Sequence, residues 1–188
     1  MSHIYTLPNL LTASRLVIAP VVVWHIVQAD VWGAFAWFAL AALTDLLDGN
    51  LARWLDQKSV LGAWLDPIAD KVMLLSTLLA LAWADAVPNW LAAVVLTRDA
   101  VILSGAGAYR WLTGRLEVAP TLSGKAATFA EFVLVSLILA DLALGPGLIR
   151  WLDPLIALTA LLVVFSGLHY VLLWALKTRD YLRTRQAS

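Results

Sequence analysis

Long apolar stretches, separated by short polar breaks, divide this chain into six segments of helical length. The clearest breaks fall at Asp30, at Asp85 and in the glycine–proline turn at residues 145–147. An α-helix rises about 1.5 Å per residue, so roughly 20 apolar residues cross the hydrocarbon core of a membrane. The pattern therefore predicts an all-α polytopic membrane protein with a short interfacial segment at residues 1–6 and six transmembrane helices at residues 7–28, 31–57, 61–84, 89–111, 120–141 and 149–177.

Charged residues gather toward one end of most of these segments. Only residues 154–176 form a long run without Asp, Glu, Lys or Arg. In the other segments the charge-free part lies next to Asp30, Asp85 or Asp141, and the polar residues occupy the opposite part. An up-down bundle would bring these polar parts together, so we expect a water-accessible cavity in one leaflet and an apolar seal in the other.

The distribution of basic residues predicts the orientation of the bundle. The side that carries the polar parts also carries most of the basic residues, namely Arg53, Lys58, Arg110, Arg115, Lys125 and the tail from Lys177 to Arg185. The other side carries four acids and one basic residue, Arg150. The positive-inside rule places the cavity and both termini on the cytoplasmic face of the inner membrane, with the tail against anionic lipid.

Composition supports a membrane protein and excludes some chemistry. The chain has 188 residues, of which 62% are hydrophobic, and a mean hydropathy of +0.82, whereas soluble domains are about 45–50% apolar. We expect one domain over residues 1–188. Thirteen basic residues balance thirteen acidic ones, so net charge identifies no partner, and we expect no nucleic acid. The absence of cysteine excludes disulfides and thiolate metal sites. Arg15 interrupts the first apolar segment, which argues against a cleavable signal.

Four acids in this apolar chain follow the pattern D-x2-D-G-x2-A-R-x8-G-x3-D-x3-D, which begins at Asp45 and ends at Asp70. Residues three, four and seven apart share one face of a helix. The pattern therefore predicts two acidic faces on consecutive helices that can converge on one site. The acids of the pattern are Asp45, Asp48, Asp66 and Asp70.

Carboxylates in such a cluster repel one another, and each costs free energy inside a membrane. Arg53 and Lys71 can neutralise two acids at most, so a solvated helix end explains the set poorly. Hard divalent cations bound through oxygen would relieve the repulsion, and we predict that the four acids bind metal. Gly49, Ala52 and Gly62 leave room for a ligand near the backbone, and the forked guanidinium of Arg53 suits a phosphate.

Four further polar residues are candidates for ligand contacts. Arg98, next to Asp99, is either an internal ion pair or a residue of the cavity, and Arg110 lies either in the cavity or at lipid headgroups. Lys125 follows Ser123-Gly124 and is a candidate phosphate contact. His169 is more often a contact between helices than a ligand. The candidates are Arg98, Arg110, Lys125 and His169.

The pattern from Asp45 to Asp70 resembles, at every defined position, the signature of the CDP-alcohol phosphatidyltransferase family. The resemblance implies transfer of a phosphatidyl group from CDP-diacylglycerol to an alcohol, with release of CMP. It also implies that the four acids bind two divalent ions, Mg²⁺ or Mn²⁺, and that Asp70 is the general base on the acceptor hydroxyl. Contacts with the CDP part are implied for Gly49, Ala52, Arg53 and Gly62. Related enzymes are often dimers, so the resemblance also admits a homodimer.

The acceptor is suggested by two further resemblances. The stretch from Leu7 to Arg15 is similar to one shared by phosphatidylglycerophosphate synthases and CMP-forming cardiolipin synthases. Arg98-Asp99, followed by Tyr109-Arg110, is more similar to the cardiolipin synthases. Phosphatidylglycerol is therefore the favoured acceptor and glycerol 3-phosphate the alternative, with the four candidates above as acceptor-binding residues.

A cation-coupled transporter or channel, in which the acids form an ion site, is the alternative of another class. The acids lie at one leaflet only, and the sequence contains no inverted repeat or interrupted helix of the kind typical of transporters. A scaffold without activity would be expected to lack part of the motif, which here has every defined position. The sequence favours an enzyme.

Overall fold

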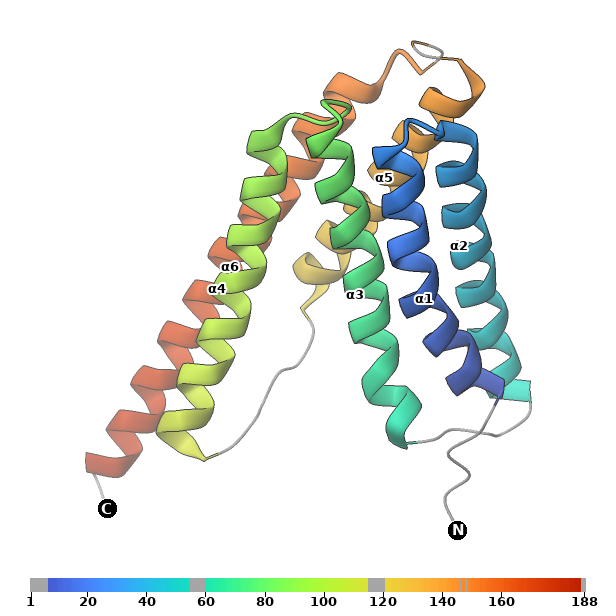
Figure 1. The fold of residues 1–188 in the computed structure, drawn as a ribbon. Coiled ribbons are helices and arrows are strands. Elements are labelled where there is room, and N and C mark those ends of the chain that lie inside the picture. The colour runs from blue at the N-terminus through green and yellow to red at the C-terminus, as the bar shows by residue number, and fades with distance from the viewer. Residues whose placement is uncertain (1–6, 55–59, 115–120, 146, 148, 187–188) are drawn as a thin grey trace. The chain divides into compact units, whose positions relative to one another are not determined.

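Six α-helices account for nearly all of the chain that the computed structural model describes, which comprises residues 7–54, 60–114, 121–145, 147 and 149–186 (Figure 1). No β-strand occurs in these ranges. Side chains are described for a smaller set, which omits those at residues 7–11, 46–54, 60–64, 180–182 and 184–186. The helices are α1 (Leu7–Val27), α2 (Val31–Trp54), α3 (Val60–Trp83), α4 (Asn89–Thr113), α5 (Leu122–Leu144) and α6 (Leu152–Gln186).

The helices begin and end close to the residues that hydropathy predicts, which confirms the six-helix pattern. The main difference is at the end of α6, which continues to Gln186 where the sequence predicted an end near Lys177. The basic tail is therefore the last part of a helix. The predicted interfacial segment at residues 1–6 lies outside the described residues.

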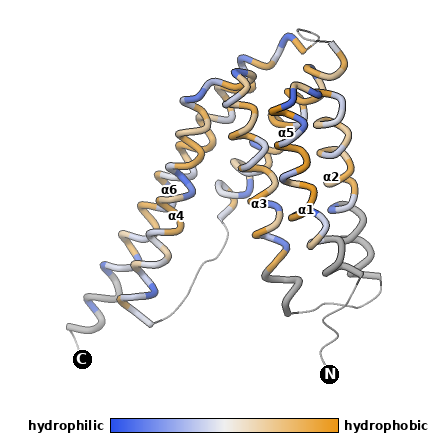
Figure 2. Tube along the Cα trace, in the orientation of Figure 1, coloured by the Kyte–Doolittle hydropathy of each residue, from blue (hydrophilic) through white to orange (hydrophobic). Residues whose placement is uncertain are grey.

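Among the described residues, three helices are long and apolar enough to cross a membrane: α4, α5 and the part of α6 from Leu152 to Arg179. Within the residues whose side chains are described, α1 and α2 contribute apolar stretches from Thr12 to Val27 and from Val31 to Asp45. Figure 2 shows hydrophobic positions dominating the described helices, with hydrophilic positions interrupting them. The six predicted helices are thus confirmed as helices, and three of them are candidate membrane spans by length and composition.

The chain forms two compact units, and α5 contributes to both. The first unit contains Met1–Val87 and Val135–Arg150, and the second contains Pro88–Leu134 and Trp151–Ser188. In the first unit α1 packs against both α2 and α3, and in the second α4 packs against α6 (Figure 1). Small or branched side chains, such as Val22, Ala34 and Ala69, are fully buried in the first unit.

A tight turn joins α1 to α2 in the first unit. Ala29 adopts a positive φ of 56°, and the Asp30 carboxylate accepts a hydrogen bond of 3.0 Å from the Gly33 amide. This bond lowers the pKa of Asp30, and a 2.9 Å contact with His25 Nδ1 adds to the effect. A Cβ at Gly33 would lie 2.3 Å from His25 Nδ1 and 2.5 Å from Asp30 Oδ2, so a larger residue there would displace the contact between these two side chains. The carboxylate thus caps the start of α2.

Candidate active site

Arg15 of α1 brings together acids from α2 and α3. Its Nη1 donates to Asp45 Oδ1 at 2.6 Å and also pairs with Asp70 Oδ1, while Nη2 lies 3.4 Å from Asp66 Oδ1. Three of the four motif acids therefore surround one guanidinium, although they lie on two different helices. The predicted convergence of the two acidic faces is observed for these three residues.

The guanidinium is buried beneath the carboxylates. Only 3% of the Arg15 side chain is exposed, whereas the side chains of Asp45, Asp66 and Asp70 are 48%, 45% and 51% exposed. Arg15 thus forms the floor of the cluster, and each acid also faces open space. A ligand can approach the acids from that open side without entering the core of the unit.

Thr12 is a second polar residue of α1 in this cluster. It lies one turn before Arg15, is fully buried, and donates a hydrogen bond from its hydroxyl to Asp66 Oδ1. Residues three apart share a helix face, so α1 presents a polar edge to the acids. Sequence reasoning missed both residues as site members. Two features of the sequence could have indicated them. Thr12 and Arg15 are polar residues at helical spacing in an apolar segment, and the four motif acids elsewhere in the chain have too few basic partners.

Arg98 is the centre of a different cluster, in the second unit. Its Nη1 donates to Asp99 Oδ1 at 2.9 Å, and its Nη2 donates to Ser166 Oγ at 3.0 Å and to the Gly124 carbonyl at 3.4 Å. The arginine is 8% exposed. Of the two interpretations of Arg98, the internal ion pair is the one observed. Its guanidinium joins α4 to α6 and to the first turn of α5.

The first turn of α5 is attached to α6 by two further contacts. Ser123 Oγ lies 2.7 Å from His169 Nδ1, and the Thr121 amide donates to Tyr170 Oη at 3.1 Å. Thr121 also caps α5, since its Oγ1 accepts from the Gly124 amide at 3.0 Å. His169 is therefore a contact between helices, the commoner of its two interpretations.

Arg110 and Lys125 are both exposed, in contrast to Arg98. Arg110 lies in the last turn of α4, and Lys125 lies in the first turn of α5. Their charges are accessible to an anionic ligand. An acceptor-binding role for either residue, and for Arg98 and His169, stays a prediction.

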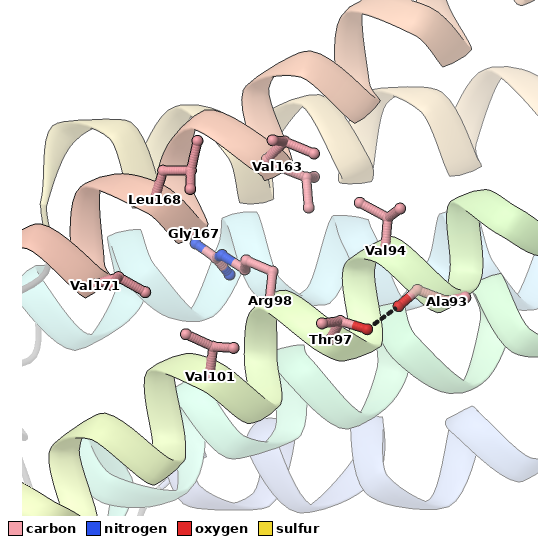
Figure 3. A pocket seen from close by; sticks show the side chains of 10 residues that line it. Ala93, Val94, Thr97, Arg98, Val101, Val163, Gly167, Leu168 and Val171 are labelled. Atoms are coloured by element: carbon pink, nitrogen blue, oxygen red, sulfur yellow. Dashed lines mark hydrogen bonds between the residues drawn. The ribbon is translucent and has the colours of Figure 1, made fainter.

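An apolar groove of about 350 Å³ lies between α4 and α6. Val94, Val101, Val163 and Leu168 are among its lining residues, and Arg98 reaches across from α4 toward α6 at its base (Figure 3). The guanidinium nitrogens of Arg98 bond to protein groups, so its aliphatic part forms the groove wall. The groove therefore offers apolar surface rather than an ionic site.

Comparison with known proteins connects the acidic cluster to a family. The family model described as CDP-alcohol phosphatidyltransferase matches residues 5–178, which includes all of the motif acids. The chain belongs to the CDP-alcohol phosphatidyltransferase family. The family that the acidic motif resembles is therefore also the family whose model matches residues 5–178.

Several curated relatives of this phosphatidyltransferase family member are cardiolipin synthases by name. A cardiolipin synthase (CMP-forming) from Streptomyces coelicolor is 37% identical, over 92% of this chain and 79% of the relative. A probable cardiolipin synthase (CMP-forming) from Drosophila melanogaster is 34% identical, over 90% of this chain and 58% of the relative. The Rattus norvegicus cardiolipin synthase (CMP-forming) is 36% identical, over 72% of this chain and 50% of the relative. The chain spans about half the length of the two animal relatives.

The remaining motif residues of this family member lie on the described backbone, while their side chains are outside the description. Asp48, Gly49, Ala52 and Arg53 belong to α2, and Gly62 belongs to α3. Helical geometry therefore places Asp48 one turn after Asp45, on a neighbouring part of the same face.

Members of this family generally depend on divalent metal ions. Among the described side chains, no three His, Asp or Glu residues are arranged to hold one ion. The three acids meet through a guanidinium, which is a broad forked group with five donors. Their oxygens nevertheless surround a positive charge and keep an open side, and carboxylate oxygens are the ligands that Mg²⁺ and Mn²⁺ prefer. The chemistry of the donor set therefore fits a hard divalent cation, although the spacing of the three acids around Arg15 is not that of a metal site.

Proposed function

We propose that this chain transfers a phosphatidyl group from CDP-diacylglycerol to an alcohol acceptor at a membrane, with release of CMP. The observation that carries the proposal is the convergence of Asp45, Asp66 and Asp70 on one buried charge. These acids lie within the residues that match the family model, and their spacing resembles the family signature. Their open side can receive the diphosphate of a nucleotide.

Phosphatidylglycerol is the proposed acceptor, and the product is then cardiolipin. The names of the relatives support this choice, because the bacterial and animal proteins are cardiolipin synthases of the CMP-forming type. Glycerol 3-phosphate, the alternative acceptor, is not favoured by these names. The exposed Arg110 and Lys125 are the proposed contacts for the anionic acceptor, and Arg98 and His169 support them from within the second unit.

In the proposed transfer, the acceptor hydroxyl oxygen bonds to the phosphorus that carries diacylglycerol. The bond from that phosphorus to the bridging oxygen breaks, CMP leaves with this oxygen, and the hydroxyl proton passes to Asp70. Two divalent ions would be held by Asp45, Asp48, Asp66 and Asp70, and when bound they would neutralise the charge that develops on the departing phosphate. Asp70 is half-exposed, so one of its oxygens is accessible to an acceptor.

The CDP part is proposed to lie against the end of α2 and the start of α3. Gly49, Ala52 and Gly62 have little or no side chain, so a nucleotide can approach their backbone closely. Arg53 offers a bidentate contact to phosphate. The acyl chains of the donor can then stay in the lipid while its nucleotide is in water.

The proposed topology has all six helices crossing the inner membrane, with the acidic cluster open to the cytoplasm. The spans α4, α5 and α6 support it by length and composition. Arg15, Asp45, Asp66 and Asp70 give α1, α2 and α3 a shared polar cluster, as expected for helices that line a polar cavity. A homodimer is part of this proposal, and the mass of the purified protein in detergent tests it.

A product analysis tests the proposed function. Purified protein is mixed with CDP-diacylglycerol and Mg²⁺ or Mn²⁺, and labelled phosphatidylglycerol and glycerol 3-phosphate are offered in parallel. We expect CMP release and labelled cardiolipin with phosphatidylglycerol only. Labelled phosphatidylglycerophosphate would reassign the acceptor. Absence of CMP with every acceptor tried, together with cation flux in proteoliposomes, would instead indicate a transporter.

A further inference from the structure

Arg15 combines deep burial with three acidic partners, and it lies outside the acidic motif from Asp45 to Asp70. A buried charge is costly unless it is paired. A guanidinium stays protonated in proteins, so this charge is permanent. The three carboxylates that it pairs with are three of the four proposed to hold metal. One set of oxygens therefore has two possible cationic partners.

We propose that Arg15 is the internal counterion of the metal-free site, and that divalent cations bind to the acids in competition with its guanidinium. This inference rests on the proposed function, because it assumes that the acids are metal ligands. It assigns Arg15 the role of a positioning residue, which acts on the reaction through the carboxylates.

The contacts explain why the two partners compete. Arg15 reaches the Oδ1 atoms of Asp45, Asp66 and Asp70 from the buried side. A cation that arrives from the open side places a double positive charge a few ångströms from the guanidinium, and like charges at that distance repel strongly. Either the guanidinium withdraws from some of its pairs or the cation binds against its repulsion. In both cases Arg15 weakens cation binding.

The same pairs explain how the metal-free protein stays folded. Without a cation near them, three neighbouring carboxylates repel one another. Arg15 neutralises part of this charge and connects α1 to both α2 and α3. Thr12 holds Asp66 through a hydroxyl, so this anchor does not depend on charge. Competition would also couple metal loading to the release of Asp70, the proposed base, from its arginine partner.

The test compares three variants in the absence of substrate. Arg15→Gln removes the charge, Arg15→Lys keeps it without the fork, and Thr12→Val removes a hydrogen bond of the same acid without changing charge. Mn²⁺ affinity is measured by electron paramagnetic resonance on protein treated with EDTA. Thermal unfolding in detergent is measured with EDTA and with saturating Mn²⁺.

We expect Arg15→Gln to unfold at a lower temperature than wild type in EDTA, and Mn²⁺ to remove most of this difference. Mn²⁺ should bind Arg15→Gln about tenfold more tightly, because the repelling charge is gone. Arg15→Lys should lie between wild type and Arg15→Gln. Thr12→Val should lose stability in both conditions, without tighter Mn²⁺ binding.

Weaker Mn²⁺ binding by Arg15→Gln, or equal stability of this variant and wild type in EDTA, would overturn the inference. If Arg15→Gln purifies only in Mn²⁺ and unfolds on chelation, the inference is supported; a variant that also fails to fold in Mn²⁺ contradicts it. Wild type that binds no Mn²⁺ would overturn the metal requirement itself. Wild type that binds Mn²⁺ but releases no CMP would overturn only the proposed activity.

Discussion

Arg98 of α4 donates two hydrogen bonds to Ser166 of α6, at 3.3 Å from Nε and 3.0 Å from Nη2. Both residues are buried. The serine is therefore a main partner of a charged group inside the second unit, where an unpaired donor is costly.

Ser166→Ala should destabilise the protein by about 1–3 kcal/mol, because it removes the acceptor of the buried Arg98 Nε and leaves Nη2 with the longer bond to the Gly124 carbonyl. Thermal unfolding in detergent measures the loss. Ser104→Ala is the matched control, since Ser104 is an exposed residue of α4 that bonds only to a carbonyl of its own helix, that of Val101, among the hydrogen bonds described for it. Equal unfolding temperatures for the two variants would contradict a structural role for Ser166.

Two glycines of α4 provide a second matched pair. A Cβ at Gly105 would lie 2.7 Å from Trp174 Cδ1, whereas a Cβ at Gly107 would meet nothing within 4 Å. Gly105→Ala should therefore cost about 1–3 kcal/mol through overpacking. Gly107→Ala should be neutral or slightly stabilising, because alanine favours the helix. Similar unfolding temperatures for both variants would show that α4 and α6 separate easily at Trp174.

Asp30 should make stability depend on pH. Its pKa is lowered by the Gly33 amide and then by His25, so the folded state favours the carboxylate. This contribution is present above the unfolded pKa of about 3.9 and is lost as pH falls through the lower folded value. Unfolding temperatures of wild type and Asp30→Asn, measured from pH 7 to pH 3, should differ most near neutrality and converge in acid. A difference that grows in acid would be inconsistent with this cap.

Asp70→Asn should abolish CMP release and leave binding of CDP-diacylglycerol measurable, because an amide cannot accept the acceptor's proton. Turnover and donor binding are measured separately, the second by a ligand-induced thermal shift. Full turnover in this variant would remove Asp70 as the base. If Asp70→Asn also loses donor binding, the main role of Asp70 is to bind the donor.

Arg110→Ala should raise the KM for the anionic acceptor more than the KM for the donor. Arg110 is an exposed cation at the end of α4 on the predicted cytoplasmic side. Arg150→Ala is the control, since it removes another exposed arginine, from the predicted opposite side. A larger effect on the donor KM, or equal effects of the two variants, would reassign Arg110.

Hydropathy and helical spacing were sufficient to predict the six helices and the shared face of Asp66 and Asp70. Both are local properties, because an apolar run or a spacing of three or four residues acts within one helix. The predicted end of α6, near Lys177, was wrong because such local patterns were the only guide. A mainly polar, basic stretch does not reveal whether the helix continues, and here it continues to Gln186.

The type of chemistry could also be predicted, because four acids at helical spacing in an apolar chain demand positive charge. Which charge they meet depends on how α1 packs against α2 and α3, and no spacing rule connects Arg15 to Asp70, 55 positions later. The same holds for Arg98, whose partners at Gly124 and Ser166 come from other helices. Local patterns thus specify the helices and their polar faces, whereas the pairing of those faces follows from contacts between residues distant in the chain.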